Sequence, residues 1–182
     1  MGPLLGGPAL WALAAILVVS APGEAAAQAC PDRDVQFEAA PSQVREALLC
    51  EIARVRERRD VRGLRGDAQL DLAATRHAAD MRERRYFSHV SPGGGDLADR
   101  AARAGYALRR CSWRVGEVLA WGVGPRATAA GTIRAWMRSP GHRSVLLSGR
   151  YREVGVGLQA GTPFAQHPSG LTAAVVVGSR DC

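Results

Sequence analysis

The stretch EVGVGLQAGTPFAQHPSGLTAAVVVG, residues 153–178, decides the fold of this chain. Residues 153–161 and 171–178 are short runs rich in valine, and β-branched residues favour strands. Between them, TPFAQHPS at 162–169 contains two prolines and precedes a glycine, a composition typical of a loop. The stretch therefore predicts two strands joined by a loop.

Helices are predicted ahead of this pair of strands. The first covers about 42–59, with Ser42 as its expected N-cap, because apolar residues recur there at helical spacings: Val44, Leu48, Ile52 and Val55. The second begins after Asp67 and the third after Asp96, since aspartate is a favoured N-cap residue. The first half of the chain is therefore expected to be mainly helical.

The middle of the chain mixes a strand with one more helix. WRVGEVLAWG at 113–122 combines β-branched and aromatic residues in a short run, which favours a strand. A helix is predicted over about 127–138, with Ile133 and Trp136 facing inward. Helices first, followed by strands mixed with one more helix, predict an α+β protein or an α/β/α sandwich rather than strict βαβ alternation.

Residues 1–29 are expected to be a signal peptide. The apolar run PALWALAAILVVSAPG is followed by small residues, and Ala27-Gln28-Ala29 fits the small-x-small rule for signal peptidase. The apolar core is shorter than the ~20 residues of a retained membrane span. We expect a secreted protein with a lead-in over 30–40 and one domain over 41–182. Lipid attachment at Cys30, the first residue after cleavage, is the alternative.

The four cysteines predict two disulfides, because an even count behind a signal peptide is typical of an oxidised protein. They are Cys30, Cys50, Cys111 and Cys182. The absence of any C-x-x-C pair argues against a zinc ribbon or a thioredoxin motif. Three pairings are compatible with this count. We favour Cys30–Cys50 and Cys111–Cys182, in which each bridge ties a chain end to the body of the domain.

The net charge of +7 comes entirely from arginine, since the 24 basic residues include no lysine. The chain also lacks asparagine, and both absences are typical of a GC-rich genome. The arginines are scattered, without the interleaved aromatic residues of single-strand binders, so no specific nucleic-acid partner is expected. A solvated basic surface is predicted, with weak attraction to an anionic envelope or polysaccharide.

Three segments carry a resemblance to a known family: YFSHVSPGG (86–94), VGEVLAWG (115–122) and AWMRSPGHRSVLL (135–147). In this order they resemble the CAP superfamily of cysteine-rich secretory proteins, antigen 5 and plant pathogenesis-related 1, and especially its bacterial secreted, SCP-like branch. The resemblance extends from about Ala47 to Gly178. It implies a three-layer α/β/α sandwich with a mostly antiparallel central sheet and a surface cleft.

The resemblance also implies a cleft cluster of two histidines and two acidic residues. Carried over residue by residue, it assigns His89 from SHVSP, Glu117 from GEVLA and His142 from SPGHR. The second acidic position falls on Ser139, so three of the four members are present. His142 is expected directly after a helix that Ser-Pro-Gly ends.

Two chemical roles stay open for this cluster. Neutral imidazoles of His89 and His142 can bind a divalent cation such as zinc, with a carboxylate or water completing the shell. Alternatively, Glu117 orients one imidazole by accepting its N–H, which fixes the tautomer. No catalytic residue is assigned. His77 is expected to be a packed core histidine outside the cluster, and His167 an exposed loop residue.

The expected function is that of a secreted binding module for a lipid, an envelope glycan or a metal, and the sequence favours a non-enzymatic role. By resemblance, eukaryotic relatives bind sterols or other lipids, and several bind divalent metals. One alternative is a metal-dependent extracellular hydrolase acting on peptide or envelope polymer. Another is a purely structural secreted scaffold. No transmembrane span is expected after signal removal, and the oligomeric state is left open.

Overall fold

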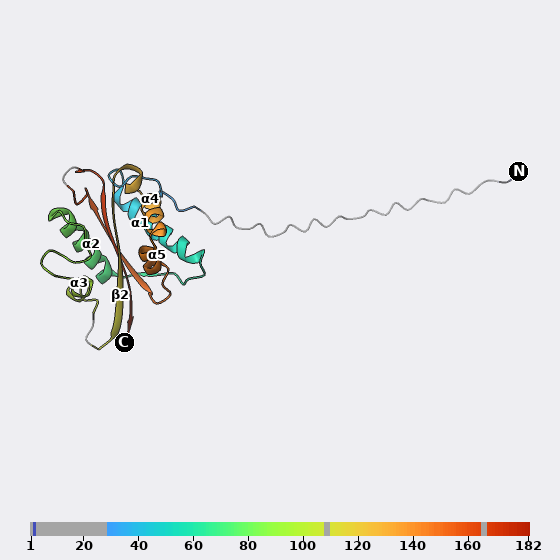
Figure 1. Cartoon of the computed structure of the whole chain (residues 1–182). Helices are drawn as coiled ribbons and strands as arrows, with labels where there is room; N and C mark the ends of the chain where they lie inside the picture. Colours follow the sequence, from blue (N-terminus) through green and yellow to red (C-terminus); the bar gives the residue numbers. More distant parts are fainter. Residues whose placement is uncertain (1, 3–28, 108–109, 165–166) are drawn as a thin grey trace.

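The computed structural model describes residues 2, 29–107, 110–164 and 167–182, so the expected signal peptide lies outside the described residues apart from positions 2 and 29. The domain is shown in Figure 1. Its elements in chain order are α1 (Pro41–Glu57), β1 (Arg65–Gly66), α2 (Ala68–Glu83), α3 (Leu97–Arg103), β2 (Ser112–Gly122), the 3-10 helix η1 (Gly124–Ala127), α4 (Ala129–Arg138), α5 (Pro140–Leu146), β3 (Glu153–Ala160) and β4 (Leu171–Asp181).

The four strands form one sheet in the order β1-β3-β4-β2. The long strands are antiparallel, and the two-residue β1 pairs with β3 in parallel. Helices α2 and α3 cover one face of the sheet, whereas α1, α4 and α5 cover the other (Figure 1). The predicted α/β/α sandwich with a mostly antiparallel sheet is therefore confirmed, and the sheet is mixed rather than wholly antiparallel.

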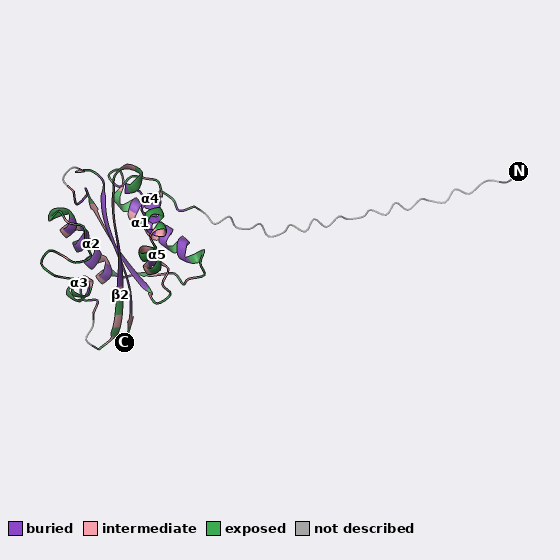
Figure 2. Cartoon of the chain, viewed as in Figure 1, coloured by how far each residue is buried: buried purple, intermediate pink, exposed green. Residues whose placement is uncertain are grey.

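The valine run of β4 is apolar throughout because both of its faces are covered. Val175 and Val177 pack in the cluster formed with α1, α4 and α5. Ala174 and Val176 pack in the cluster formed with α2 and α3. Figure 2 shows the central strands as buried along most of their length. A continuous apolar run is the expected sequence of a strand that lies between two helical layers.

Two glycines in β3 allow α2 to lie directly against the sheet. A Cβ atom on Gly155 would lie 2.0 Å from the backbone carbon of Leu70, and one on Gly157 would lie 2.2 Å from that of Ala74. Both distances are far below van der Waals contact. The alternation EVGVG in the sequence is thus a helix-packing surface as well as a strand.

Most of the predicted helix boundaries agree with the structure. Asp67 accepts a hydrogen bond from the Leu70 amide at 2.9 Å, and Asp96 forms a capping box with Asp99. The expected N-cap role of Ser42 is wrong, because α1 already begins at Pro41. Proline is well suited to the first helical turn, where its missing N–H needs no partner.

Both predicted disulfides are present. Cys30 bonds to Cys50, and Cys111 bonds to Cys182, with Cα–Cα distances of 5.8 Å and 4.3 Å. The first bridge attaches the irregular segment 30–40 to α1, and the second joins the region before β2 to the end of β4. The Cys30 sulfur, once bonded to Cys50, cannot also carry a thioether-linked lipid, so this pairing is incompatible with the lipid-anchor alternative.

We predict that Gly157→Ala destabilises the protein by about 3 kcal/mol, because the added methyl group would overlap backbone atoms of α2 rather than a movable side chain. The measurement is urea unfolding followed by circular dichroism. Gly63→Ala is the matched control, since a Cβ at Gly63 meets no atom within 4 Å. It should change stability by less than about 0.5 kcal/mol. Equal effects of the two substitutions would contradict the packing assigned to β3.

Candidate functional site

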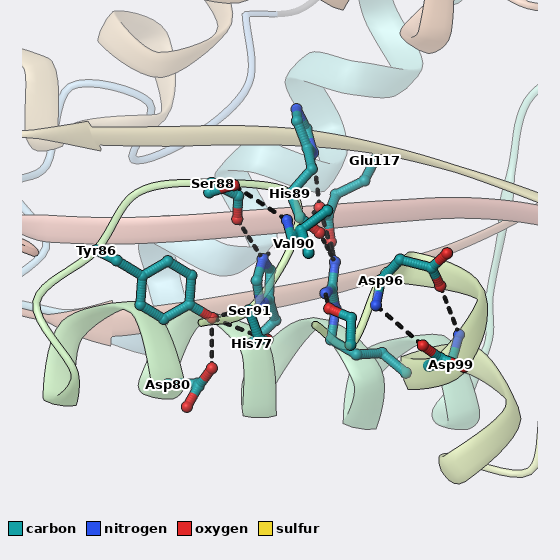
Figure 3. A network of polar contacts seen from close by, with 12 residues as sticks. His77, Asp80, Tyr86, Ser88, His89, Val90, Ser91, Asp96, Asp99 and Glu117 are labelled. Atoms are coloured by element: carbon teal, nitrogen blue, oxygen red, sulfur yellow. Dashed lines mark hydrogen bonds and ion pairs between the residues drawn. The ribbon is translucent and has the colours of Figure 1, made fainter. Parts of the chain in front are cut away.

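The candidate site is built on Glu117, which lies in the edge strand β2 and faces α2 and α3. Its side chain is only 1% exposed. Arg100 Nη2 donates to both carboxylate oxygens, at 2.9 Å to Oε1 and 3.0 Å to Oε2. His89 Nδ1 donates to Oε2 at 2.8 Å (Figure 3). A buried carboxylate is stable only when it is paired and hydrogen-bonded, and this one is bonded through both oxygens.

Arg100 positions the loop as well as the carboxylate. It lies in α3, and its side chain is 7% exposed. Besides Glu117, its guanidinium group donates to the His89 carbonyl at 3.0 Å and to the Gly95 carbonyl at 3.2 Å. The capping box at the start of α3 fixes the helix from which Arg100 extends. One buried arginine therefore ties α3, β2 and the loop 89–95 together.

His89 presents its outer ring nitrogen to solvent. Because a carboxylate only accepts hydrogen bonds, the contact with Glu117 places the proton of the neutral ring on Nδ1. Nε2 then carries the lone pair, and the side chain is 56% exposed. The imidazole is thus held in one tautomer and one orientation while its reactive edge stays accessible.

His77 is buried, as the sequence predicts, but it also belongs to the polar network around Glu117. Its side chain is fully enclosed, and Nε2 donates to the Ser88 carbonyl at 3.1 Å and lies 3.8 Å from Glu117 Oε2. Burial lowers the pKa of His77, with Glu117 opposing this shift and Arg100 adding to it. The predicted core position of His77 is therefore confirmed, and its contact with Glu117 is an additional finding that the sequence did not indicate.

Tyr86 and Asp80 extend the network away from Glu117. The Tyr86 hydroxyl lies 3.4 Å from His77 Nδ1 and 3.1 Å from Ser91 Oγ, and it donates to the Asp80 carboxylate (Figure 3). Burial, followed by the Asp80 hydrogen bond, raises the pKa of Tyr86 to about 12. Tyr86 therefore stays protonated and acts as a structural donor.

His142 lies in a helix rather than in a loop, which corrects the sequence expectation. Ser139 ends α4 and is also the N-cap of α5, and His142 is the third residue of α5. Burial lowers the pKa of His142, and a positive charge on His89, when that ring is protonated, lowers it further. Its Nδ1 is buried without a hydrogen-bond partner among the described residues. Glu117 bonds to His89 and Arg100 rather than to His142.

The donor set does not fit a divalent cation held by His89, Glu117 and His142. Both oxygens of Glu117 accept hydrogen bonds, and the Arg100 guanidinium places a positive charge beside them. Over the described ranges, no group of three or more His, Cys, Asp or Glu side chains is arranged to hold a metal ion. Structural and catalytic zinc sites use at least three protein ligands. The remaining pair of imidazoles falls short of that number.

A shallow cavity of about 350 Å³ adjoins His89 and Glu117. Its other walls are mostly apolar side chains, contributed by Val90, Leu97, Ala98 and Val115, with Asp96 at one side. Val90 is 47% exposed and the neighbouring Phe87 is 39% exposed. The outer edge of the imidazole is therefore bordered by an apolar surface, an arrangement that suits a ligand with one polar group and an apolar part.

Comparison with known proteins identifies the family. The model of the cysteine-rich secretory protein family, CAP, matches residues 49–170. The chain therefore belongs to the CAP family, as the resemblance in its sequence predicted. No helix in the part of the chain that the structure covers is both long enough and apolar enough to cross a membrane.

Its curated relatives include two proteins of Bacillus subtilis (strain 168). The uncharacterized membrane protein YlbC is 37% identical over 84 residues, which cover 45% of this chain and 22% of the relative. The uncharacterized protein YkwD is 30% identical over 112 residues, covering 61% of this chain and 41% of the relative. The chain thus matches less than half the length of each.

Two solved structures show the same fold. An outer surface protein of Borrelia burgdorferi has a TM-score of 0.62 at 21% identity, with 76% of this chain and 94% of that chain covered. An extracellular protein of Bacillus anthracis that contains an SCP domain has a TM-score of 0.57 at 24% identity, with 75% and 43% covered. Both are bacterial, and at these identities they establish the architecture alone.

We predict that His77 makes the protein less stable at mildly acidic pH. Its pKa is lowered in the folded state, so below the ordinary value of 6.5 the unfolded chain takes up a proton that the folded protein does not. Stability should fall as the pH decreases through this window, by at most about 1.4 kcal/mol per pH unit for one proton.

His77→Gln should reduce this pH dependence, because glutamine keeps a donor for the Ser88 carbonyl but does not titrate. The measurement is urea unfolding over a series of pH values. The double variant His77→Gln/His142→Gln should show a still weaker dependence, since burial lowers both pKa values. An unchanged slope in His77→Gln would show that this histidine does not control the acid response.

Proposed function

We propose that this chain is an extracellular binding domain that recognises an amphipathic, lipid-like ligand at His89 and the apolar cavity beside it. The observation that carries this proposal is the exposed imidazole of His89, oriented by the buried Glu117 carboxylate and bordered by Val90, Leu97 and Val115. A binding site that is fixed before the ligand arrives loses little entropy on binding.

An extracellular location is supported by the two disulfides, which persist in oxidising compartments. It is also supported by the family, which is described as secretory, and by the signal-peptide pattern of residues 1–29. The Bacillus anthracis relative is itself described as extracellular.

The chemistry of the proposed site follows from the tautomer of His89. Nε2 accepts a hydrogen bond from a ligand hydroxyl, and the apolar wall removes the adjoining hydrocarbon from water at about 25 cal/mol per Å². A cavity of about 350 Å³ accommodates a polar head with its first methylene groups rather than a complete long-chain lipid.

A purely structural role is the main competing reading, because Arg100 and Glu117 are buried and would stiffen any domain. The exposure of His89 favours binding. A histidine whose only role was to pair with Glu117 could be buried beside it, whereas 56% of the His89 side chain is exposed to solvent. The metal-dependent hydrolase receives no support from the donor set described above.

The test is a thermal-shift titration with monooctanoylglycerol, an uncharged lipid with free hydroxyls, below its solubility limit. We expect a saturable rise in the melting temperature, corresponding to about 2.7 kcal/mol when the free lipid is at 100 times its Kd. His89→Ala should remove the shift. His167→Ala is the matched control. His167 lies in the loop between β3 and β4 and stacks on Trp121 of β2.

Two outcomes would contradict the binding proposal. One is an unchanged melting temperature of the wild-type protein at every lipid concentration. The other is a shift that persists in His89→Ala. If His89→Ala lowers the melting temperature in the absence of lipid, and lipid does not change the melting temperature of the wild type, the purely structural role is correct instead.

A further inference from the structure

A second, larger cavity of about 650 Å³ lies between α2, α3 and the loop that joins them. Four arginines line it: Arg76 and Arg84 on the side of α2, and Arg100 and Arg103 from α3. Apart from Ala73, every lining residue is charged, polar or glycine. Its composition therefore differs sharply from the apolar cavity beside His89, and the proposed lipid site does not explain it.

Two of the four arginines are already neutralised. Arg100 pairs with Glu117, and Arg84 Nη1 lies 3.5 Å from Asp80 Oδ1. Asp80 also accepts the hydrogen bond of Tyr86. These contacts account for one lining carboxylate and two lining guanidinium groups.

Arg76 and Arg103 retain their positive charge without an ion pair to any carboxylate of the described residues. The remaining acidic group of the lining is Asp99, which caps α3 by accepting the Asp96 amide at 3.1 Å. Its charge is offset in part by the positive end of the helix dipole. Two unpaired cations thus face a single, partly compensated anion.

The glycines of the loop keep this cavity open. Gly93, Gly94 and Gly95 place no side chain in it, and Gly94 has a left-handed backbone with a φ of +86°. The Arg103 guanidinium lies against Gly95, with Nη2 only 3.0 Å from the position that a Cβ would occupy. Because Gly95 has no side chain, the Arg103 guanidinium group can lie along the cavity wall.

Arg100 is the most buried charged group of the lining, at 7% exposure. Its guanidinium is held by Glu117 and by two backbone carbonyls, and its Nε is buried without a partner among the described residues. Because the Glu117 carboxylate compensates its charge, Arg100 fixes the wall of the cavity, and Arg76 and Arg103 carry the positive charge that is not compensated.

We infer that this cavity binds the phosphate group of a phosphate ester, with Arg76 and Arg103 as the two ligating side chains. One guanidinium group can donate two parallel hydrogen bonds to two phosphate oxygens. Two guanidinium groups from different helices therefore match an anion with three oxygens and up to two charges. The volume exceeds that of phosphate alone, so the ester carries a polar group such as a sugar or glycerol.

Isothermal titration calorimetry with inorganic phosphate and with glycerol 1-phosphate tests this inference, at constant pH and ionic strength. We expect saturable binding of both, and a loss of affinity of about tenfold or more in Arg76→Gln/Arg103→Gln. Both side chains are exposed, so the variant should fold normally, as its melting temperature will show.

Arg58→Gln/Arg59→Gln is the control with the same change in net charge, since both arginines are exposed just after α1. Its affinity should stay within about twofold of the wild type. An equal loss in both double variants would show non-specific attraction and would overturn the inference, as would the absence of phosphate binding. His89→Ala should leave phosphate affinity unchanged, so this inference and the lipid proposal can fail separately.

Sedimentation with vesicles of phosphatidylglycerol and phosphatidylcholine distinguishes the two sources of the phosphate. Co-sedimentation that glycerol 1-phosphate competes away assigns the phosphate to a lipid headgroup. Binding of glycerol 1-phosphate in solution without co-sedimentation assigns it to a soluble or polymer-borne ester. Either result is compatible with the site, because the ligating chemistry is the same.

Discussion

The buried ion pair between Glu117 and Arg100 is the interaction on which the site and its surroundings depend. A carboxylate with 1% exposure costs several kcal/mol when its partner is missing. The pair requires α3 to stand beside the edge strand β2, and it requires the loop 89–95 to fold back so that its carbonyls meet the guanidinium. The position of His89 is therefore a consequence of charge compensation, and a substitution of Glu117 or Arg100 would affect the fold as well as the site.

The same ion pair separates two surfaces of different chemistry. On one side, the imidazole of His89 borders an apolar wall, and on the other, the arginines of α2 and α3 line a polar cavity. Arg100 contributes to both, because its guanidinium bonds to Glu117 while the side chain lines the larger cavity. The domain therefore presents an apolar surface and an arginine-lined, positively charged surface, and the loop 89–95 contributes residues to both.

Local signals account for what the sequence predicts well. The valine runs and the aspartate caps indicate structure within a few residues, and each is found where expected, whereas Pro41 displaced the cap expected at Ser42. The even cysteine count predicts two disulfides, and the favoured pairing is present although its bridges span 20 and 71 residues. The motifs also indicate that His89 and Glu117 meet. Arg100 was missed because one arginine in LADRAARA resembles the other scattered arginines. Its place on the inner face of the helix, beside Ala101, is the signal that could have revealed a buried partner. His77 was placed correctly in the interior, yet its contact with Glu117 depends on tertiary packing that periodicity does not encode.

The central position of β4 governs when this protein can fold. β4 is the last strand along the chain, yet it lies between β2 and β3 and supplies side chains to both helical layers. Without residues 171–181, β2 has no partner strand, β3 keeps only its two-residue pairing with β1, and both helical layers lack the strand that they share. If the chain collapses before residues 171–181 are available, apolar surface and unpaired strand edges stay exposed, and the chain is prone to aggregate. Productive folding of the domain therefore requires residues 171–181, and the long-range strand pairing makes it slow.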